Sequence, residues 1–215
     1  MQTSGYTVFI VDDDSSVRDA LGLLLGLQGH PVALFADAES FLRVYQPEWR
    51  GCLLVDIRMP GMDGLSLQKC LLEKGSKIPV IVMTGHGDVG SARAAFRAQA
   101  IDFLEKPLDH TRLANAIEEA FSRQSTVQAN ESRQAEFRQL LQNLTPRERE
   151  VMDQVVIGKH NREIAEILGI STRTVEVHKA RMMTKLGVAG VPDLVRLSLM
   201  TGNADIPPAQ PEALP

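Results

Sequence analysis

Five short apolar segments recur along the first half of the chain, and segments with helical periodicity separate them. Turn-forming residues bound each apolar segment, which is typical of buried strands. Alternating strands and helices predict an α/β fold, in which a doubly wound, five-stranded parallel sheet carries helices on both faces. The expected strands are Tyr6–Val11, Pro31–Phe35, Cys52–Val55, Pro79–Met83 and Ile101–Leu104, and the expected helices are Ser15–Gln28, Ala38–Tyr45, Leu65–Glu73, Val89–Ala98 and Asp109–Phe121.

Polar residues follow four of these five strands at the point where each strand ends. Asp12–Asp14 come after the first strand, Asp56 after the third, Thr84 after the fourth and Lys106 after the fifth. Because parallel strands all end at one edge of a sheet, these side chains are expected to meet there. Crowded carboxylates repel one another, and Mg²⁺ with oxygen ligands would neutralise them. The pattern predicts a phosphoryl-transfer site.

A polar, glutamine-rich segment separates this region from a second, helical one. Residues 123–142 contain neither Gly nor Pro, which predicts a helical linker between a domain at 1–122 and a domain at 143–202. Thr145, Pro146 and Glu148 have the pattern of a helix start, with an N-cap, a proline at the first helical position and a capping box. Residues 203–215 contain four prolines and are expected to form a disordered tail.

The helical region contains a helix-turn-helix pattern. Asn161–Leu168 is followed by Gly169-Ile170 and then by Ser171–Leu186, a spacing typical of DNA-reading helix pairs. In Ser171–Gly187 four basic residues accompany one acidic residue, which favours a polyanionic partner although the whole chain carries −4. The sequence therefore predicts a small all-α domain that binds double-stranded DNA.

The second helix of this pair has an inward face and an outward face. Val175, Met182 and Leu186 recur at helical spacing and are expected to be buried. Glu176, Val177 and Ala180 lie on the opposite face, where they could contact base edges. Flanking residues suit phosphate contacts, namely Arg173, Thr174, His178, Lys179, Arg181 and Lys185.

The motifs IVDDD, LLVDIRMPGMDG, VIVMTG and FLEKP, in that order, resemble the flavodoxin-like receiver domain of bacterial two-component response regulators. The resemblance implies that Asp56 accepts a phosphoryl group and that Mg²⁺ is held by Asp12, Asp13, Asp56 and the backbone carbonyl of Arg58. It also implies that Lys106 and Thr84 bind the phosphate, and that Phe103 forms a switch pair with Thr84.

The helical region resembles LuxR-type DNA-binding domains through LTPREREVM, IGKHNREIAEILGIS and TVEVHKARMMTKLG. Together with the receiver, the resemblance is to the FixJ/NarL family. It implies a sensor histidine kinase as phosphodonor, a homodimer when phosphorylated, paired DNA half-sites and contact with RNA polymerase. The implied function is activation of transcription by a non-enzymatic protein in the cytoplasm. Glu176 stands where some members have a basic residue, so their base preferences do not transfer.

Two enzyme classes are alternatives. Gly85–Gly90 matches the dinucleotide-binding pattern GxGxxG, but it follows the fourth strand rather than an opening one. Asp12-x-Asp14 resembles the first motif of haloacid-dehalogenase-type phosphatases, with Asp12 as the nucleophile; this reading leaves Asp56 without a role. The chain shows no membrane-spanning segment, and Cys52 and Cys70 are expected to be free thiols.

Overall fold

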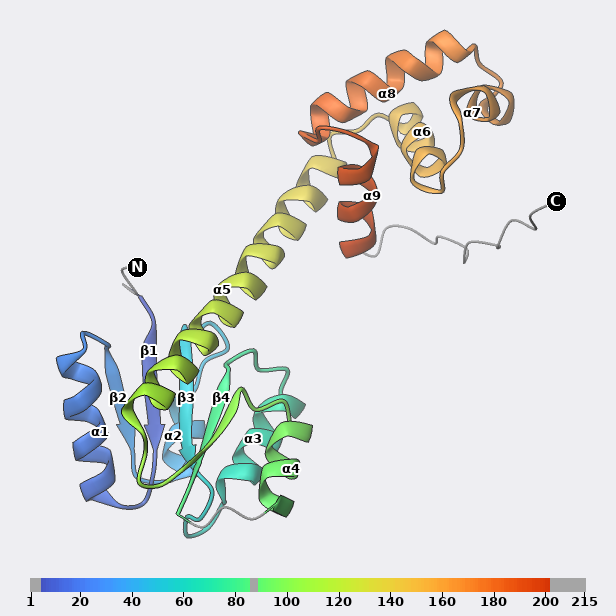
Figure 1. Cartoon of the computed structure of the whole chain (residues 1–215). Coiled ribbons are helices and arrows are strands. Elements are labelled where there is room, and N and C mark those ends of the chain that lie inside the picture. The colour runs from blue at the N-terminus through green and yellow to red at the C-terminus, as the bar shows by residue number, and fades with distance from the viewer. Residues whose placement is uncertain (1–4, 86–88, 202–215) are drawn as a thin grey trace. The chain divides into compact units, whose positions relative to one another are not determined.

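The first part of the chain forms a five-stranded sheet (Figure 1). The computed structural model describes residues 5–85 and 89–201. The strands pair in parallel in the order β2-β1-β3-β4-β5, with Val8 opposite Cys52 and Leu53 opposite Val80. This is the predicted doubly wound sheet. Its strands are β1 (Thr7–Val11), β2 (Val32–Phe35), β3 (Gly51–Asp56), β4 (Val80–Thr84) and β5 (Asp102–Glu105).

Helices cover both faces of the sheet and bury alternate strand residues. Helices α1 (Ser15–Leu27) and α5 (His110–Leu141) pack on Val8, Ile10, Cys52 and Leu54. The other face packs against α2 (Ala38–Val44), α3 (Gly64–Glu73) and α4 (Val89–Arg97). All six residues of β3 are buried, which is expected for a central strand of a parallel sheet. The two apolar cores hold the carboxyl ends of the strands in fixed register.

Aspartates begin three of these helices. Asp14, Asp37 and Asp63 are the N-caps of α1, α2 and α3, and each side chain accepts a hydrogen bond from the backbone N–H of a serine in the first turn. An N-cap satisfies an amide that has no partner within the helix. The carboxylate of Asp14 therefore accepts a hydrogen bond from the Ser16 N–H at 2.8 Å and caps α1. This role differs from that of Asp12 in the neighbouring acidic site.

Helix α5 is longer than its expected range, because it continues unbroken through residue 122 to Leu141. Gln124 is 3% exposed; its Oε1 accepts a hydrogen bond from the Gly51 N–H at 2.6 Å, and its Nε2 donates one to the Trp49 carbonyl at 3.1 Å. These bonds bind residues past 122 to the sheet. The chain accordingly divides into two units between Gln128 and Ala129.

Within residues 129–201, the described part of the second unit, the secondary structure is helical. The end of α5 and helices α6 (Pro146–Val156), α7 (Asn161–Leu168), α8 (Thr172–Leu186) and α9 (Val191–Met200) share one apolar core. The capping box of Thr145 and Glu148 is present, with Pro146 in the first turn of α6. Gly169, at φ 65°, ends α7 in the left-handed conformation, which favours glycine. The helix-turn-helix is thus confirmed at the predicted residues.

Three further expectations have different outcomes. Cys52 is buried and Cys70 half-buried, both as free thiols, and burial raises the pKa of Cys52. Among the described residues, no helix is both long enough and apolar enough to cross a bilayer. The expected disordered tail at 203–215 and residues 86–88 of the GxGxxG match lie outside the described residues.

Candidate functional site

Three side chains from the ends of three strands meet at the carboxyl edge of the sheet. The Lys106 Nζ lies 2.6 Å from Oδ2 of Asp12 and 2.5 Å from Oδ1 of Asp56. Asp12 and Asp56 are 0% and 4% exposed, so both carboxylates are largely removed from water. Asp56 and Lys106, which lie 44 and 94 positions after Asp12 in the chain, therefore join Asp12 in one cluster. The order of the strands along the chain predicted this cluster.

Backbone groups fix the two carboxylates. The Asp14 N–H donates to Oδ1 of Asp12 at 3.0 Å, and the Arg58 N–H donates to Oδ2 of Asp56 at 2.7 Å. Each carboxylate thus has one oxygen on a backbone amide and the other on Lys106. Hydrogen bonds to ionised groups are stronger than those between neutral groups, so they hold the carboxylate oxygens in place for chemistry.

Negative charge exceeds positive charge in this cluster. Burial raises the pKa of Asp12 and outweighs the opposing hydrogen bonds from Lys106 and Asp14. Burial would lower the pKa of Lys106, but its hydrogen bonds and charge interactions with Asp12 and Asp56 raise it overall, so Lys106 is an ammonium group. Two buried carboxylates face one cation. The excess negative charge favours a further cation at the site.

The donor set fits a hard cation such as Mg²⁺, which takes carboxylate and carbonyl oxygens. Asp12 and Asp56 already converge on one positive charge, and Asp13 follows Asp12 on the exposed side of the same loop. Residues 5–85 and 89–201 contain no group of three His, Cys, Asp or Glu side chains arranged as a metal site. Of the expected Mg²⁺ ligands, the carboxylates of Asp12 and Asp56 are the two that lie together, both in contact with Lys106.

The expected switch residues lie on β4, which pairs with the β3 strand of Asp56, and on β5, which pairs with β4 at the edge of the sheet. Thr84 is the last residue of β4 and 1% exposed, and Phe103 is a half-buried residue of β5 packed against the core. In the strand register, Phe103 is opposite Val82, and Thr84 is opposite Glu105. The two side chains therefore lie on adjacent strands near the site, which is compatible with coupled movement.

Two residues near the site escaped the sequence reasoning. Arg18 of α1 donates from Nη1 to the Asp12 carbonyl at 2.6 Å and so anchors the acidic loop. Gly64 begins α3 beneath Asp56, and a Cβ at this position would lie 2.1 Å from the Asp56 carbonyl oxygen. Arg18 lies one helical turn after the Asp14 cap, and this spacing could have indicated that its side chain lies near the acidic loop. Nothing in the sequence identified the Asp12 carbonyl as its acceptor.

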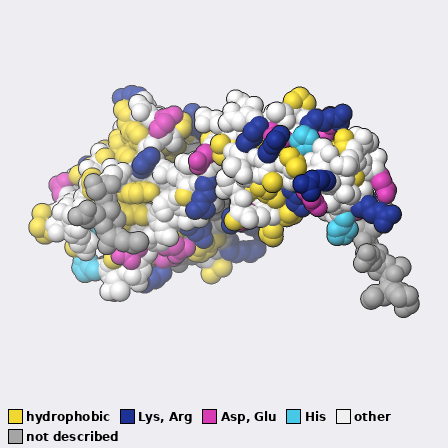
Figure 2. All heavy atoms as spheres, turned by 90° about the horizontal axis from the view of Figure 1, so that it is seen from above, with side chains coloured by type: hydrophobic (Ala, Val, Ile, Leu, Met, Phe, Trp, Pro, Cys, Tyr) yellow, Lys and Arg dark blue, Asp and Glu magenta, His cyan; other side chains and the backbone are white. Residues whose placement is uncertain are grey.

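Helix α8 has the two faces that its periodicity predicted. Val175, Met182 and Leu186 are buried, whereas Val177 is 42% exposed, with Glu176 and Ala180 also exposed. Figure 2 looks down on α8 from the top of Figure 1 and shows Lys and Arg side chains gathered on this unit. Arg173 and Arg181 are exposed, and Thr174, His178 and Lys179 are half-buried. The expected base-facing and phosphate-facing residues thus share one accessible helix.

Lys185 differs from the rest of this set. Its Nζ lies 2.7 Å from Oε2 of Glu148, which is 3% exposed, and it also donates to the Asn143 carbonyl at 3.2 Å. Hydrogen bonds from Lys185 and from the Thr145 backbone lower the pKa of Glu148 to about 2. Its ammonium group therefore joins α8 to α6 and contributes to the stability of the unit.

This ion pair predicts a loss of stability in acid. A lowered pKa in the folded state stabilises the fold above the unfolded-state value, here near 4.5, and the contribution disappears as the pH falls toward 2. We expect Glu148→Gln to destabilise the unit by about 1 kcal/mol at pH 7, since Lys185 is partly solvated. The difference should shrink at pH 3. Hydrogen exchange of α8 amides in the full-length protein measures it; a difference independent of pH would contradict the assignment.

Family comparisons agree with both units. Residues 8–118 match the response regulator receiver domain, and residues 142–198 match the luxR family of bacterial regulatory proteins. The two matches together cover most of the chain; the first ends within α5 and the second begins just after it.

Relatives match this chain along nearly its whole length. The chain is 42% identical over 204 residues to the transcriptional regulatory protein FixJ of Azorhizobium caulinodans, covering 95% of this chain and 97% of that protein. It is 43% identical over 198 residues to FixJ of Rhizobium meliloti, covering 92% and 97%.

Solved structures give the same result. The response regulator StyR matches with a TM-score of 0.75 at 40% identity, over 91% of this chain and 99% of that one. Full-length FixJ from B. japonicum matches with a TM-score of 0.57 at 39% identity, over 94% and 100%. The strand order, the buried Asp56 cluster and these matches agree: the chain belongs to the response regulators that join a receiver to a LuxR-type DNA-binding domain, and it is a FixJ-like transcription regulator rather than an enzyme.

Proposed function

We propose that a sensor histidine kinase phosphorylates Asp56 and that the phosphorylated protein dimerises, binds paired DNA half-sites and activates transcription through contact with RNA polymerase. The contact of Lys106 with both buried carboxylates is the observation that carries the first step, because it places a cation where negative charge develops. The α8 surface carries the DNA-binding step.

The chemistry proposed for Asp56 is in-line phosphoryl transfer. A carboxylate oxygen of Asp56 attacks phosphorus, an O–P bond forms, and the P–N bond of the phosphohistidine breaks with its electrons returning to the imidazole. Lys106 then holds a phosphoryl oxygen, and Thr84 donates its hydroxyl to another. Mg²⁺ bound through Asp12, Asp13, Asp56 and the Arg58 carbonyl would supply further neutralisation of the phosphoryl oxygens.

The first test is the site of modification. Incubation with acetyl phosphate and Mg²⁺ should add one phosphoryl group, which mass spectrometry should locate on Asp56, and Asp56→Asn should abolish the labelling. The dehalogenase-type alternative puts the phosphoryl group on Asp12. Undiminished labelling of the Asp56→Asn protein would therefore reject the receiver mechanism, whereas Asp63→Asn, which changes only a helix cap, serves as the control.

Phosphorylation would act through β4, which pairs with the β3 strand of Asp56, and through β5 beyond it. A phosphoryl group adds about −1.5 to −2 charge and new acceptor oxygens. We infer that Thr84 turns toward these oxygens and that Phe103 of the neighbouring strand moves inward, which changes the surface near β5 and promotes dimerisation. Two-fold symmetry of the dimer would then present two α8 helices to two half-sites.

Base contacts are proposed for one group of α8 residues and phosphate contacts for another. Glu176, Val177 and Ala180 would face base edges, where Glu176 could accept from cytosine and the apolar pair could contact thymine methyls. Arg173, Thr174, His178, Lys179 and Arg181 would contact phosphates, which supply affinity without sequence preference.

Lys179→Ala should weaken binding to all DNA sequences alike. Losing one phosphate contact releases about one fewer counterion, so the slope of log K against log salt should fall by about 1. Fluorescence anisotropy with specific and random duplexes from 50 to 200 mM salt measures both effects. Lys69→Ala, which removes an exposed receiver ion pair with Glu73, is the control. A loss confined to one sequence would show that Lys179 reads bases instead.

A further inference from the structure

The backbone carbonyl of Asp12 is buried beside the acidic site. Strand β1 ends at Val11, and the next peptide unit, which joins Asp12 to Asp13, begins the loop that leads to α1. Asp12 is 0% exposed, so solvent water does not reach this oxygen. Arg18 supplies a donor instead, because its Nη1 lies 2.6 Å from the Asp12 carbonyl oxygen. Without this donor a buried acceptor would be left unsatisfied, which is unfavourable.

Arg18 is itself held by the helix that the loop enters. Its side chain is half-buried, and its backbone N–H donates to the Asp14 carbonyl at 3.1 Å in the first turn of α1. The side chain of Asp14 caps the same turn through the Ser16 N–H. The guanidinium group thus extends back from a fixed helical turn to the loop before it. A hydrogen bond from a charged donor is shorter and stronger than one between neutral groups, so it restrains this loop effectively.

The restrained peptide unit lies between two of the expected Mg²⁺ ligands. Because a peptide unit is planar, holding the Asp12 carbonyl limits rotation on both sides of the plane, in Asp12 and in Asp13. The Asp12 carboxylate is held as well by the Asp14 N–H and by Lys106, whereas Asp13 is exposed. The direction of the Asp13 side chain therefore depends mainly on the backbone. Mg²⁺ requires nearly octahedral ligands at about 2.1 Å, so a rotated loop would bind it poorly.

The charge of Arg18 works against metal binding, whereas its hydrogen bond works in favour of it. The bond goes to the Asp12 carbonyl, and the two carboxylate oxygens of Asp12 stay with the Asp14 N–H and Lys106. A positive charge near a cation site repels the incoming cation, so charge alone predicts tighter Mg²⁺ binding when Arg18 is replaced by a neutral residue. Loss of loop orientation predicts weaker binding. The sign of the change separates the two effects.

We propose that Arg18 is a positioning residue for divalent-cation binding. It holds the peptide between Asp12 and Asp13 in the orientation that a cation bound by both carboxylates requires, and this effect exceeds the repulsion from its charge. The inference rests on the proposed function for the identity of the ligands, Asp12, Asp13 and Asp56. It adds a residue of α1 that acts through the backbone of the loop and does not contact the cation.

Titration of the unphosphorylated full-length protein with MgCl₂, followed by the amide chemical shifts of Asp12–Asp14 in NMR spectra, tests this proposal. Arg18→Met keeps most of the apolar stem and removes the donor. We expect its Kd for Mg²⁺ to be about tenfold higher, the lower end of the usual effect of removing a group that orients a metal ligand. Arg18→Lys can still donate one hydrogen bond to the carbonyl, so its Kd should stay within about threefold of the unmodified protein.

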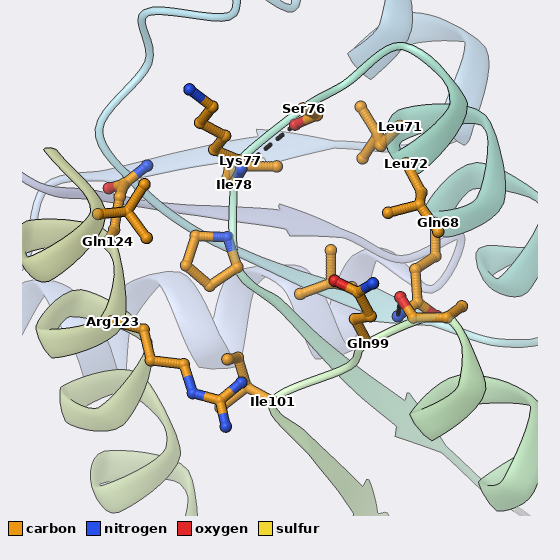
Figure 3. Close-up of a pocket in the computed structure, with 14 residues that line it drawn as sticks. Gln68, Leu71, Leu72, Ser76, Lys77, Ile78, Gln99, Ile101, Arg123 and Gln124 are labelled. Carbon is orange, nitrogen blue, oxygen red and sulfur yellow. Dashed lines mark hydrogen bonds between the residues drawn. The ribbon is translucent and has the colours of Figure 1, made fainter. Parts of the chain in front are cut away.

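Arg123→Met is the matched control, because it makes the same change of side chain and charge at the other end of the sheet. Arg123 extends from α5 beside Ile101, which precedes β5 (Figure 3). Its loss should leave the Kd for Mg²⁺ unchanged. Unfolding in urea, followed by Trp49 fluorescence, should show that every variant is folded under the titration conditions.

Three results would overturn the inference. Binding of Mg²⁺ by folded Arg18→Met that equals or exceeds that of the unmodified protein would show that the hydrogen bond does not position the loop. The same conclusion would follow if Arg18→Lys bound Mg²⁺ as weakly as Arg18→Met. Both of these results would leave the proposed phosphorylation of Asp56 intact, since labelling with acetyl phosphate tests it separately. Absence of Mg²⁺ binding by the unmodified protein would overturn the inference together with the proposed role of the cation.

Discussion

Replacing Gly51 with alanine should unfold the receiver domain under conditions in which the unmodified protein is folded. Gly51 begins β3 at φ 143°, and a Cβ there would lie 1.7 Å from the Thr7 carbonyl oxygen of β1. Backbone cannot move aside as a flexible side chain does, because β1 and β3 are paired from Thr7 and Gly51 onward. We expect a loss above about 4 kcal/mol, a large part of the 5 to 15 kcal/mol that stabilises a typical domain.

Gly75 provides a matched control for this substitution. It also has a positive φ, 70°, but a Cβ there would meet nothing within 4 Å. Gly75→Ala should therefore cost only about 1 to 2 kcal/mol, from the left-handed backbone. Urea unfolding followed by the fluorescence of Trp49, the single tryptophan, which stacks on Phe9 at 4.5 Å, measures both variants. Equal losses at the two positions would show that conformation, not the clash with Thr7, sets the cost.

Lys106→Ala should reduce the rate of Asp56 phosphorylation by about 10²- to 10³-fold, the usual effect of removing one group that stabilises transition-state charge. The substitution removes the cation lying 2.5 Å from Asp56 and 2.6 Å from Asp12. The developing charge on the phosphoryl oxygens then lacks a partner, and the two carboxylates repel each other. Initial rates with acetyl phosphate and saturating Mg²⁺ measure the effect.

Two comparisons make this result interpretable. Lys69→Ala removes a lysine that is 74% exposed and paired only with Glu73, and it should leave the rate unchanged. Unfolding followed by Trp49 fluorescence should show that the Lys106→Ala protein is folded at the assay temperature. A folded Lys106→Ala protein with a rate within threefold of the unmodified one would remove Lys106 from the proposed mechanism.

Local pattern predicted much of the receiver site. Asp12, Asp56 and Lys106 could be grouped without a structure, because parallel strands place their carboxyl ends at one edge whatever residues lie between them. The same reasoning assigned the inward and outward faces of α8, since a 3.6-residue repeat decides which side chains are buried.

Contacts between segments far apart in the chain could not be predicted from sequence patterns. Gln124 looked like part of a polar linker, yet its amide bonds to Gly51 and Trp49 and joins α5 to the sheet. The pairing of Lys185 with the buried Glu148 was likewise not predicted. In both cases a polar residue has many possible partners in sequence, and only the packed chain selects one.

The sequence alone therefore determined the order of strands and helices along the chain, the cap that begins α6 and the identity of the residues at the acidic edge. These follow from periodicity and turn chemistry, which act over a few residues. The tertiary structure decided how far α5 stays attached to the sheet and which lysine pairs with the buried Glu148. Those outcomes depend on burial and on hydrogen bonds between residues far apart in the chain, and such interactions exist only once the segments have packed.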